Sequence, residues 1–196
     1  MPSWGKIITM RITERAHEAV RAAVKEGEEV VDATAGNGHD TVFLAKLVGA
    51  GGRVFAFDIQ EEALISTRAN LEASGVPSER VSLIRESHAG LGDYVINPVA
   101  AVMFNLGYLP GGDHQIRTRC EETVIGLERA WEVIRAEGIV TVACYRGHPG
   151  GQEEGKSVLE AAHKLALRGA VMDTYGLAGA DSGPFLVVLR LSLIHI

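Results

Sequence analysis

Residues 30–40 of this 196-residue chain read Val-Val-Asp-Ala-Thr-Ala-Gly-Asn-Gly-His-Asp. They begin as a short apolar run, which is typical of a buried strand. Gly36 and Gly38 follow at alternate positions, and an apolar helical run extends over residues 41–48. A strand, a glycine turn and a helix in this order present backbone N–H groups to a ligand at the carboxyl edge of a parallel sheet. We therefore expect an α/β fold with a ligand bound on this turn.

Acidic residues near the turn argue against a ligand that carries phosphate. The third glycine of a dinucleotide fingerprint is replaced here by Thr41, and Asp40 precedes it. A carboxylate in the first helical turn repels a pyrophosphate, whereas the ammonium of S-adenosylmethionine (SAM) is attracted to Asp32 or Asp40. Asp58 ends the next apolar run, where an acid can bind a ribose diol. The pattern favours SAM over NAD; the alternative is that the glycines only shape a turn and Asp58 only caps a helix.

The composition indicates one α/β domain spanning residues 1–196. Hydrophobic residues make up 46% of the chain and charged residues 22%, and no apolar run is long enough for a membrane span. Cys120 and Cys144 lie far apart without metal-type spacing, so we expect reduced thiols, no metal site and a cytoplasmic protein. The net charge of −6 argues against a broad basic face that coats nucleic acid, although a local basic rim stays open.

Strand-like and helix-like segments alternate along the chain. The expected strands cover residues 30–33, 53–58, 81–85, 99–105, 139–145, 171–175 and 185–191. The expected helices include residues 13–25, with Thr13 as cap, a longest helix over 116–135, and 153–167. Two consecutive strands at the end predict an antiparallel hairpin. The pattern predicts a Rossmann-like class I methyltransferase fold: a mostly parallel seven-stranded sheet with helices on both faces. Trp131 is expected to pack in the core, and residues 191–196 to form a non-native tail.

Three loops are expected to meet at the carboxyl edge of this sheet. The first begins at Asn105, whose carbonyl oxygen can accept a hydrogen bond from an amine, and contains Tyr108, which can stack on a base. Its order, Asn-Leu-Gly-Tyr-Leu-Pro, is similar to the Asn-Pro-Pro-Tyr loop of amino-group methyltransferases. The second loop spans residues 145–151 and the third is Ser87-His88. The alternative for the histidines in these loops is a structural or solvated role.

Five motifs together resemble the YtqB (MnmM) family of SAM-dependent methyltransferases. They occupy residues 32–41, 57–60, 87–88, 104–113 and 147–151. The resemblance extends over most of the chain, from about Thr13 to Leu189, and the segment at 104–113 is its most specific part. It implies methylation of 5-aminomethyl-2-thiouridine at the wobble position of tRNA to the 5-methylaminomethyl form. It also implies a homodimer.

The resemblance implies a role for residues of each loop. The expected SAM-binding residues are Asp32, Thr34, Gly36, Asn37, Gly38, Asp40, Thr41, Asp58, Gln60, Ser87, His88 and Asn105. The expected catalytic residues are Asn105, Tyr108, Asp113 and His114, with the last two as candidate acceptors of the amine proton. The expected substrate-binding residues are Tyr108, Asp113, Tyr145, His148, Arg117 and Arg146. The chain departs from the family pattern at His114, where lysine is common, and at residues 181–184, where the family is rich in Asn and Pro.

Four basic residues flank these loops and can hold phosphates: Arg117, Arg119, Arg146 and Lys156. The alternative is that they are ordinary solvated charges. A wobble base lies in an anticodon loop that is already partly unstacked, so a pocket can take it without opening a duplex. Three other classes stay open from the sequence: a SAM-dependent enzyme acting on rRNA or a small amine, an NAD-binding oxidoreductase, and an RNA-binding protein without catalysis.

Overall fold

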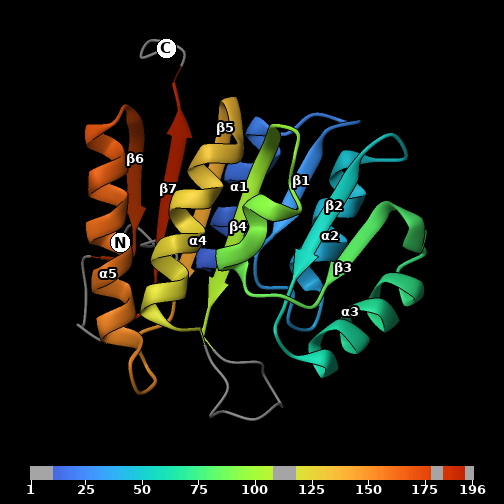
Figure 1. Ribbon diagram of the computed structural model, residues 1–196, viewed down its shortest axis with the longest axis horizontal. Coiled ribbons are helices and arrows are strands. Elements are labelled where there is room, and N and C mark those ends of the chain that lie inside the picture. The colour runs from blue at the N-terminus through green and yellow to red at the C-terminus, as the bar shows by residue number, and fades with distance from the viewer. Residues whose placement is uncertain (1–10, 108–117, 178–182, 193–196) are drawn as a thin grey trace, which may run out of the picture.

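The computed structural model describes residues 11–107, 118–177 and 183–192. Its centre is one seven-stranded sheet with the order β3-β2-β1-β4-β5-β7-β6 (Figure 1). The strands are β1 (Glu29–Asp32), β2 (Arg53–Phe57), β3 (Val81–Ile84), β4 (Val99–Leu106), β5 (Ile134–Cys144), β6 (Ala170–Tyr175) and β7 (Phe185–Leu191). β7 runs antiparallel to both of its neighbours, and the pairs from β3 to β5 are parallel. The predicted fold and its terminal hairpin are confirmed.

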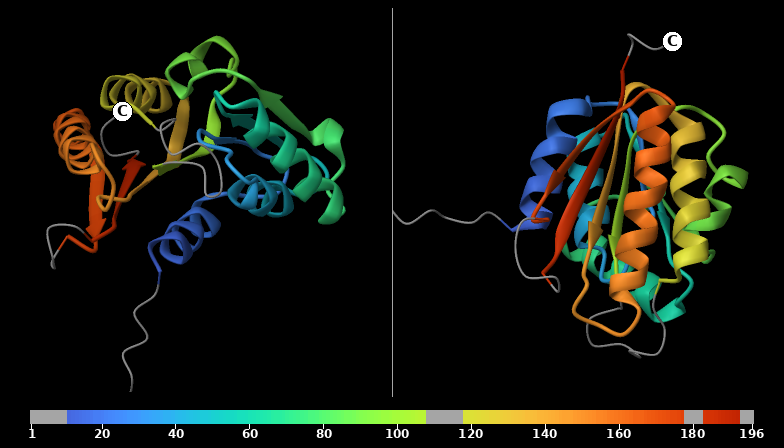
Figure 2. Two further views of the ribbon diagram at one scale, coloured as in Figure 1. Left: turned by 90° about the horizontal axis from the view of Figure 1, so that it is seen from below. Right: turned by 90° about the vertical axis from the view of Figure 1, so that its left-hand side faces the viewer.

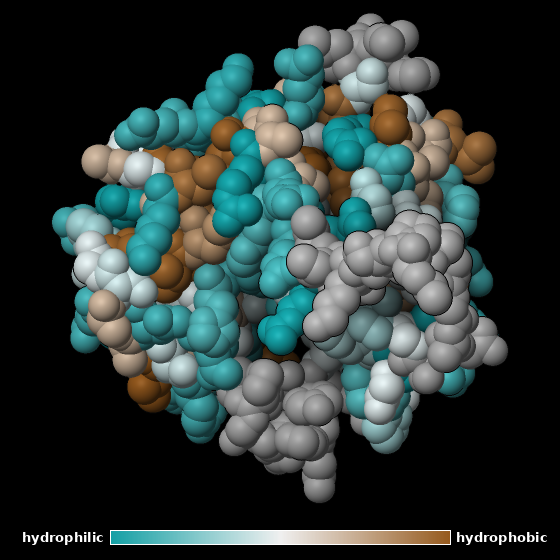
Figure 3. Space-filling model, turned by 180° about the vertical axis from the view of Figure 1, so that it is seen from behind, coloured by the Kyte–Doolittle hydropathy of each residue, from teal (hydrophilic) through white to brown (hydrophobic). Residues whose placement is uncertain are grey.

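Helices cover both faces of the sheet (Figure 2). The helices are α1 (Ile12–Ala23), α2 (His39–Val48), α3 (Glu61–Ala73), α4 (Cys120–Val133) and α5 (Gly151–Leu167), with short 3-10 turns η1 (Ser78–Arg80) and η2 (His88–Asp93). α4, α5 and η2 pack on one face around Phe57, Phe104 and Leu127. α1, α2 and α3 pack on the other around Val20, Leu44 and other buried residues. Hydrophilic residues cover much of the outer side of this second face (Figure 3), as expected for amphipathic helices.

The expected helix over 116–135 is shorter in the structure. α4 ends at Val133, and Ile134 already belongs to β5, where it pairs with Val99. Ile134 is buried in either role, so its apolar character could not separate a last helical turn from a first strand residue. The longest of the described helices is instead α5, which begins at Gly151, two residues before the expected start.

The cap of the N-terminal helix lies two residues earlier than expected. It is Arg11 rather than Thr13, and the Glu14 carboxylate accepts a hydrogen bond from the Arg11 backbone N–H over 3.1 Å. This bond satisfies a donor at the first turn and so favours the earlier start. Leu191, which the sequence analysis assigns both to the end of the last strand and to the start of the tail, belongs to β7 and pairs with Ala170.

Core positions follow the sequence pattern closely. Trp131 is 8% exposed and belongs to the core, as predicted. Both cysteines are free; Cys144 is buried, and burial raises the pKa of its thiol, whereas Cys120 is only half-buried. In the described ranges, no helix is long and apolar enough to cross a membrane. The same ranges contain no group of three or more His, Cys, Asp or Glu side chains placed to hold a metal ion.

Candidate active site

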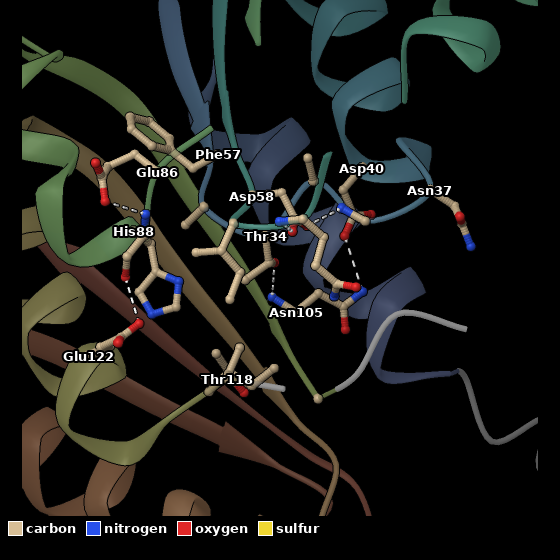
Figure 4. A pocket seen from close by; sticks show the side chains of 18 of the residues that line it. Thr34, Asn37, Asp40, Phe57, Asp58, Glu86, His88, Asn105, Thr118 and Glu122 are labelled. Atoms are coloured by element: carbon tan, nitrogen blue, oxygen red, sulfur yellow. Dashed lines mark hydrogen bonds between the residues drawn. The ribbon is translucent and has the colours of Figure 1, made fainter. Parts of the chain in front are cut away.

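A pocket of about 440 Å³ opens at the carboxyl ends of the strands (Figure 4). It lies where β1 is flanked by β2 on one side and β4 on the other, which is the switch point at which open α/β sheets bind ligands. Its volume falls within the range of about 300–1,000 Å³ found for small-molecule sites. The lining includes eleven of the predicted site residues: Thr34, Gly36, Asn37, Asp40, Asp58, Gln60, Ser87, His88, Asn105, Tyr145 and His148.

The Asp58 carboxylate ties the glycine turn to the start of α3. Its Oδ2 accepts a hydrogen bond from the Gly36 backbone N–H over 2.9 Å, and its Oδ1 accepts one from the Gln60 N–H over 2.9 Å. Burial raises the pKa of Asp58, and these backbone hydrogen bonds act in the opposite direction. The carboxylate therefore lines the pocket in a fixed orientation beside the turn.

Asp32 lies behind the pocket wall and is fully buried. Its oxygens accept hydrogen bonds from the Thr34 backbone N–H over 3.1 Å and the Thr41 hydroxyl over 2.6 Å. Burial, together with the charge of Asp40, raises the pKa of Asp32 from 3.8 to about 7. Asp32, Thr41 and Gly38 are not among the lining residues. Their described contacts support the turn, and their predicted role in binding SAM stays a prediction.

Gly38 adopts the left-handed conformation at the N-terminus of α2, with φ of 80°. A Cβ atom at this position would lie 2.7 Å from the Thr67 Cα atom of α3. The Thr67 hydroxyl also donates a hydrogen bond to the Gly36 carbonyl over 3.1 Å. The second glycine is therefore required both by its backbone conformation and by the close approach of α3.

Asn105 lies opposite the glycine turn, at the end of β4. Its backbone N–H donates to the Thr34 hydroxyl oxygen over 2.7 Å, and its side-chain Nδ2 donates to Oδ2 of Asp40 over 3.3 Å. The two side chains point toward each other in Figure 4. Tyr145 and His148, from the segment after β5, line the same side, and burial raises the pKa of the Tyr145 phenol. The predicted meeting of the β4 and β5 loops is thus present.

A third group surrounds the loop after β3. The Ser87 hydroxyl donates to Glu122 of α4 over 2.8 Å, and the Ser87 N–H donates to its neighbour Glu86 over 2.9 Å. His88 is buried, and burial lowers the pKa of its imidazole. Its Nε2 has no hydrogen-bond partner within the described residues. A buried polar atom of this kind at the pocket suits a polar ligand group.

The described residues fit SAM at this site. The pocket has room for a ligand of that size, and the unpartnered Nε2 of His88 offers a place for one of its polar groups. The Asp58 carboxylate stands where this fold class places the acid that binds a ribose diol. The acidic wall, with Asp40 and Glu86, suits a cationic ligand better than a phosphate.

Several predicted residues do not reach the pocket or cannot be placed. Arg146 points instead to β7: its Nε donates to the Gly183 carbonyl over 2.7 Å, and its guanidinium lies 5.1 Å from the ring centroid of Phe185. Arg119 and Lys156 are exposed. Four of the predicted site residues lie outside the described residues: Tyr108, Asp113, His114 and Arg117.

The sequence did not single out four residues that shape the site: His17, Glu86, Thr118 and Glu122. Glu86 directly precedes the predicted site residue Ser87, and this position in the loop after β3 was a signal that could have identified it. Glu122 and Thr118 become pocket residues only because the N-terminal end of α4 lies at the carboxyl edge. His17 lies on α1, and its Nε2 is 2.6 Å from Oδ1 of Asp40. The spacing of these two residues along the chain does not indicate their contact.

The fold and the pocket define a class I SAM-dependent methyltransferase domain. The family model described as "Putative rRNA methylase" matches residues 54–190. The chain belongs to this family. A second model, of the ubiE/COQ5 methyltransferase family, matches residues 6–94.

Two curated relatives are similar to the chain over much of its length. A chloroplastic tRNA (mnm(5)s(2)U34)-methyltransferase of Arabidopsis thaliana is 39% identical over 153 residues, which cover 74% of this chain and 56% of the relative. A probable cobalt-precorrin-6B C(15)-methyltransferase of Saccharolobus solfataricus is 30% identical over 128 residues, covering 65% of this chain and 58% of the relative. The chain thus spans somewhat over half the length of these curated relatives.

Solved structures share the fold almost throughout. A "putative rRNA-methylase" from Clostridium thermocellum is 42% identical with a TM-score of 0.88, covering 92% of this chain and 97% of that one. A "putative methyltransferase" from Streptococcus mutans, in complex with SAH, is 33% identical with a TM-score of 0.82, covering 92% and 98%. These similarities confirm the predicted family and the methyltransferase fold.

Proposed function

We propose that this protein is a SAM-dependent methyltransferase that methylates a primary amine, the 5-aminomethyl group of wobble 5-aminomethyl-2-thiouridine in tRNA. The observation that carries the proposal is the position of the Asn105 carboxamide, at the pocket and 3.3 Å from Asp40 beside the glycine turn. An amide at this place can accept a hydrogen bond from an amine that approaches the cofactor. The name of the Arabidopsis relative supports the same substrate.

Residues on the β1–β3 side hold the cofactor in this proposal. When bound, SAM supplies an activated methyl group on a sulfonium. Asp58 binds the ribose hydroxyls, the backbone of the glycine turn holds the methionine end near Asp40, and His88 contacts a polar group of the nucleoside. NAD fits less well, because its pyrophosphate would lie against Asp40 at the start of α2.

The acceptor amine must lose a proton before it can attack. An alkylamine is largely protonated at neutral pH, and desolvation in a closed pocket lowers its pKa. Asn105 and Tyr145 position the amine and the base in this proposal, and Asp113 or His114 accepts the proton. Positioning supplies much of the rate, because the methyl donor is already activated.

The RNA side of the proposal uses the rim of the pocket. Tyr145 is 37% exposed and offers an aromatic face to a base that is turned out of the anticodon loop. The exposed Arg119 and Lys156 bind phosphates in this proposal. A cytoplasmic location and a homodimer stay predictions from the sequence.

Methyl transfer from labelled SAM tests the proposed function. We expect incorporation into tRNA that carries 5-aminomethyl-2-thiouridine and none into matched tRNA that lacks the aminomethyl group. Transfer to rRNA or to a free small amine, with no transfer to the aminomethyl tRNA, would replace the proposed acceptor. The mass of the co-purified ligand separates SAM from NAD.

Substitution of Asp58 tests the cofactor half separately. Asp58→Ala is expected to weaken SAM binding by about 10-fold or more, because hydrogen bonds to a charged group contribute about 1.5–3 kcal/mol each. Asp58→Asn, which keeps the size of the side chain and can still accept one of the two backbone hydrogen bonds, is the matched control and should lose less. Calorimetry measures both. Unchanged affinity in Asp58→Ala would show that the ribose assignment is wrong.

A further inference from the structure

A histidine that does not line the pocket contacts one of its carboxylates. The Nε2 atom of His17, on α1, lies 2.6 Å from Oδ1 of Asp40, and the side chain of His17 is 23% exposed. The Asp40 side chain is 11% exposed and belongs to the pocket lining. The Asp40 carboxylate therefore links α1 to the pocket.

Packing holds the His17 ring in this position. The ring stacks on Phe43 with centroids 3.8 Å apart and an angle of 7° between the planes. The Arg21 guanidinium covers Phe43 at 4.8 Å. Because Phe43 and Asp40 lie one turn apart on α2, the same helix fixes both the ring and its hydrogen-bond partner.

The second oxygen of Asp40 determines how the Asn105 amide is turned. Oδ2 of Asp40 is 3.3 Å from Nδ2 of Asn105. An ionised carboxylate only accepts hydrogen bonds, so the NH2 end of the amide must face it and the carbonyl oxygen must face the other way. The bond from the Asn105 N–H to Thr34 fixes the backbone of the same residue. The orientation of the Asn105 amide thus follows from the fact that its partner, the Asp40 carboxylate, can only accept hydrogen bonds.

We propose that His17 is a positioning residue for the acceptor amine. By holding Asp40, it keeps the Asn105 carbonyl oxygen directed at the amine, so that the amine donates a hydrogen to this oxygen and aims its lone pair at the methyl group. Without His17, the Asp40 carboxylate can rotate and the amide can turn over. The inference rests on the proposed function, because it needs an amine as acceptor.

Three variants test the role of His17 in turnover. His17→Ala removes the donor, and His17→Gln keeps a donor near the position of Nε2 but does not titrate. His163→Ala is the matched control, because His163 is exposed on α5 and its Nδ1 lies 2.7 Å from the Leu159 carbonyl oxygen of the same helix. For each, kcat and KM are measured with aminomethyl tRNA, and the affinity for S-adenosylhomocysteine by calorimetry.

We expect His17→Ala to lower kcat by about 10-fold or more, as for a misplaced reactive group, with KM and cofactor affinity within about twofold. His17→Gln should restore most of the rate, and His163→Ala should match the wild type. A wild-type kcat in His17→Ala would overturn the proposal. So would a kcat in His17→Gln as low as in His17→Ala, which would indicate that His17 acts by titration. A parallel loss of cofactor affinity would indicate general structural damage and would also overturn it.

A second measurement does not depend on turnover. The side-chain amide signals of Asn105 in a ¹⁵N spectrum are identified by their absence in Asn105→Ala. We expect these signals to shift and to exchange faster with solvent in His17→Ala, and to stay unchanged in His17→Gln. Unchanged signals in His17→Ala would overturn the proposed positioning, even if the wild type methylates another acceptor. Failure of the wild type to methylate aminomethyl tRNA, with the signals shifted as expected, would instead refute the proposed substrate alone.

Discussion

The two sides of the pocket are built in different ways. On the proposed cofactor side, short segments at the ends of β1 and β2 are joined by the hydrogen bonds that the Asp58 carboxylate accepts from backbone N–H groups, and Gly38 packs closely on α3. On the acceptor side, Asn105 is held by side chains from two other elements, Thr34 and Asp40, and the aromatic residue comes from beyond β5. The first side depends on local backbone geometry, and the second on contacts between distant segments.

The same difference appears in the charges. The pocket wall near the ends of β2 and β3 carries the carboxylates of Asp58 and Glu86, whereas the basic residues Arg119 and Lys156 lie on the segments that follow β4 and β5. In the proposed function, a cationic cofactor meets the carboxylates and a polyanionic substrate meets the basic residues.

Asn105→Ala should have the largest effect and should be confined to the acceptor side. Loss of the amide removes the proposed contact with the amine, and removal of one such polar contact in an active site lowers kcat by about 100-fold or more. The affinity for SAM, measured by calorimetry, should fall by less than about 10-fold, because Asp58 and the glycine turn remain. If affinity and kcat fell together, Asn105 would belong to the cofactor side and the division of the pocket would be wrong.

Gly38→Ala should damage the cofactor side through the fold itself. The substitution imposes a left-handed conformation on alanine and brings its Cβ against the Thr67 backbone. The first effect costs about 1–2 kcal/mol and the second about 1–3 kcal/mol. Gly27 has a φ of 87° with nothing within 4 Å of its Cβ position, so Gly27→Ala isolates the conformational part. Urea unfolding should show a larger loss of unfolding free energy for Gly38→Ala than for Gly27→Ala. Equal losses would mean that α3 moves to make room for the added Cβ atom.

The pH dependence of stability tests the burial of Asp32. Its pKa is raised from 3.8 to about 7 in the folded protein, so the folded state holds this proton more tightly than the unfolded state. The associated stability is fully present below about pH 4 and is lost as the pH rises toward and through 7. At about 1.4 kcal/mol for each pKa unit, the loss is at most about 4 kcal/mol.

Asp32→Asn should remove this loss, since the amide stays neutral and can still accept one of the two hydrogen bonds. We expect the free energy of unfolding of the wild type to decline relative to Asp32→Asn between pH 4 and pH 8. Asp173→Asn serves as the control, because Asp173 is a half-exposed partner of Arg190 on the surface of the sheet. Parallel curves for wild type and Asp32→Asn would show that Asp32 is ionised in the folded protein throughout this range.

The cofactor side was predicted from sequence more completely than the acceptor side for a physical reason. The glycines, the strand run and Asp58 act through backbone conformation within about 30 residues, which leaves a local pattern. The pattern still left out the surroundings of Asp32: an acid before a glycine turn predicts a ligand contact, whereas the structure shows Thr34 and Thr41 donating hydrogen bonds to its oxygens inside the fold. Burial of that kind depends on how α2 packs, and the pattern does not contain it.

On the acceptor side, the sequence located Asn105 correctly at the end of a strand but gave no sign of its partners. His17 reaches Asp40 from 23 positions earlier in the chain, and Thr34 reaches Asn105 across 71 positions. Arg146 was predicted to bind the substrate; in the structure its Nε donates to the Gly183 carbonyl just before β7, and its guanidinium lies over the Phe185 ring of β7. These contacts follow from the order of the strands, which had to be known first.

The smallest expected effect concerns the basic residues Arg119 and Lys156, and it tests the difference in charge between the two sides of the pocket. Each phosphate contact to single-stranded nucleic acid contributes about 0.7 to the slope of log affinity against log salt concentration. The double variant Arg119→Gln/Lys156→Gln should therefore lower the magnitude of this slope for tRNA by about 1.4. The matched control is Arg129→Gln/Arg168→Gln, because these exposed arginines pair with Glu132 and Glu128 near the opposite end of α4. An unchanged slope in the first variant would make Arg119 and Lys156 solvated charges and would move the phosphate contacts elsewhere on the chain.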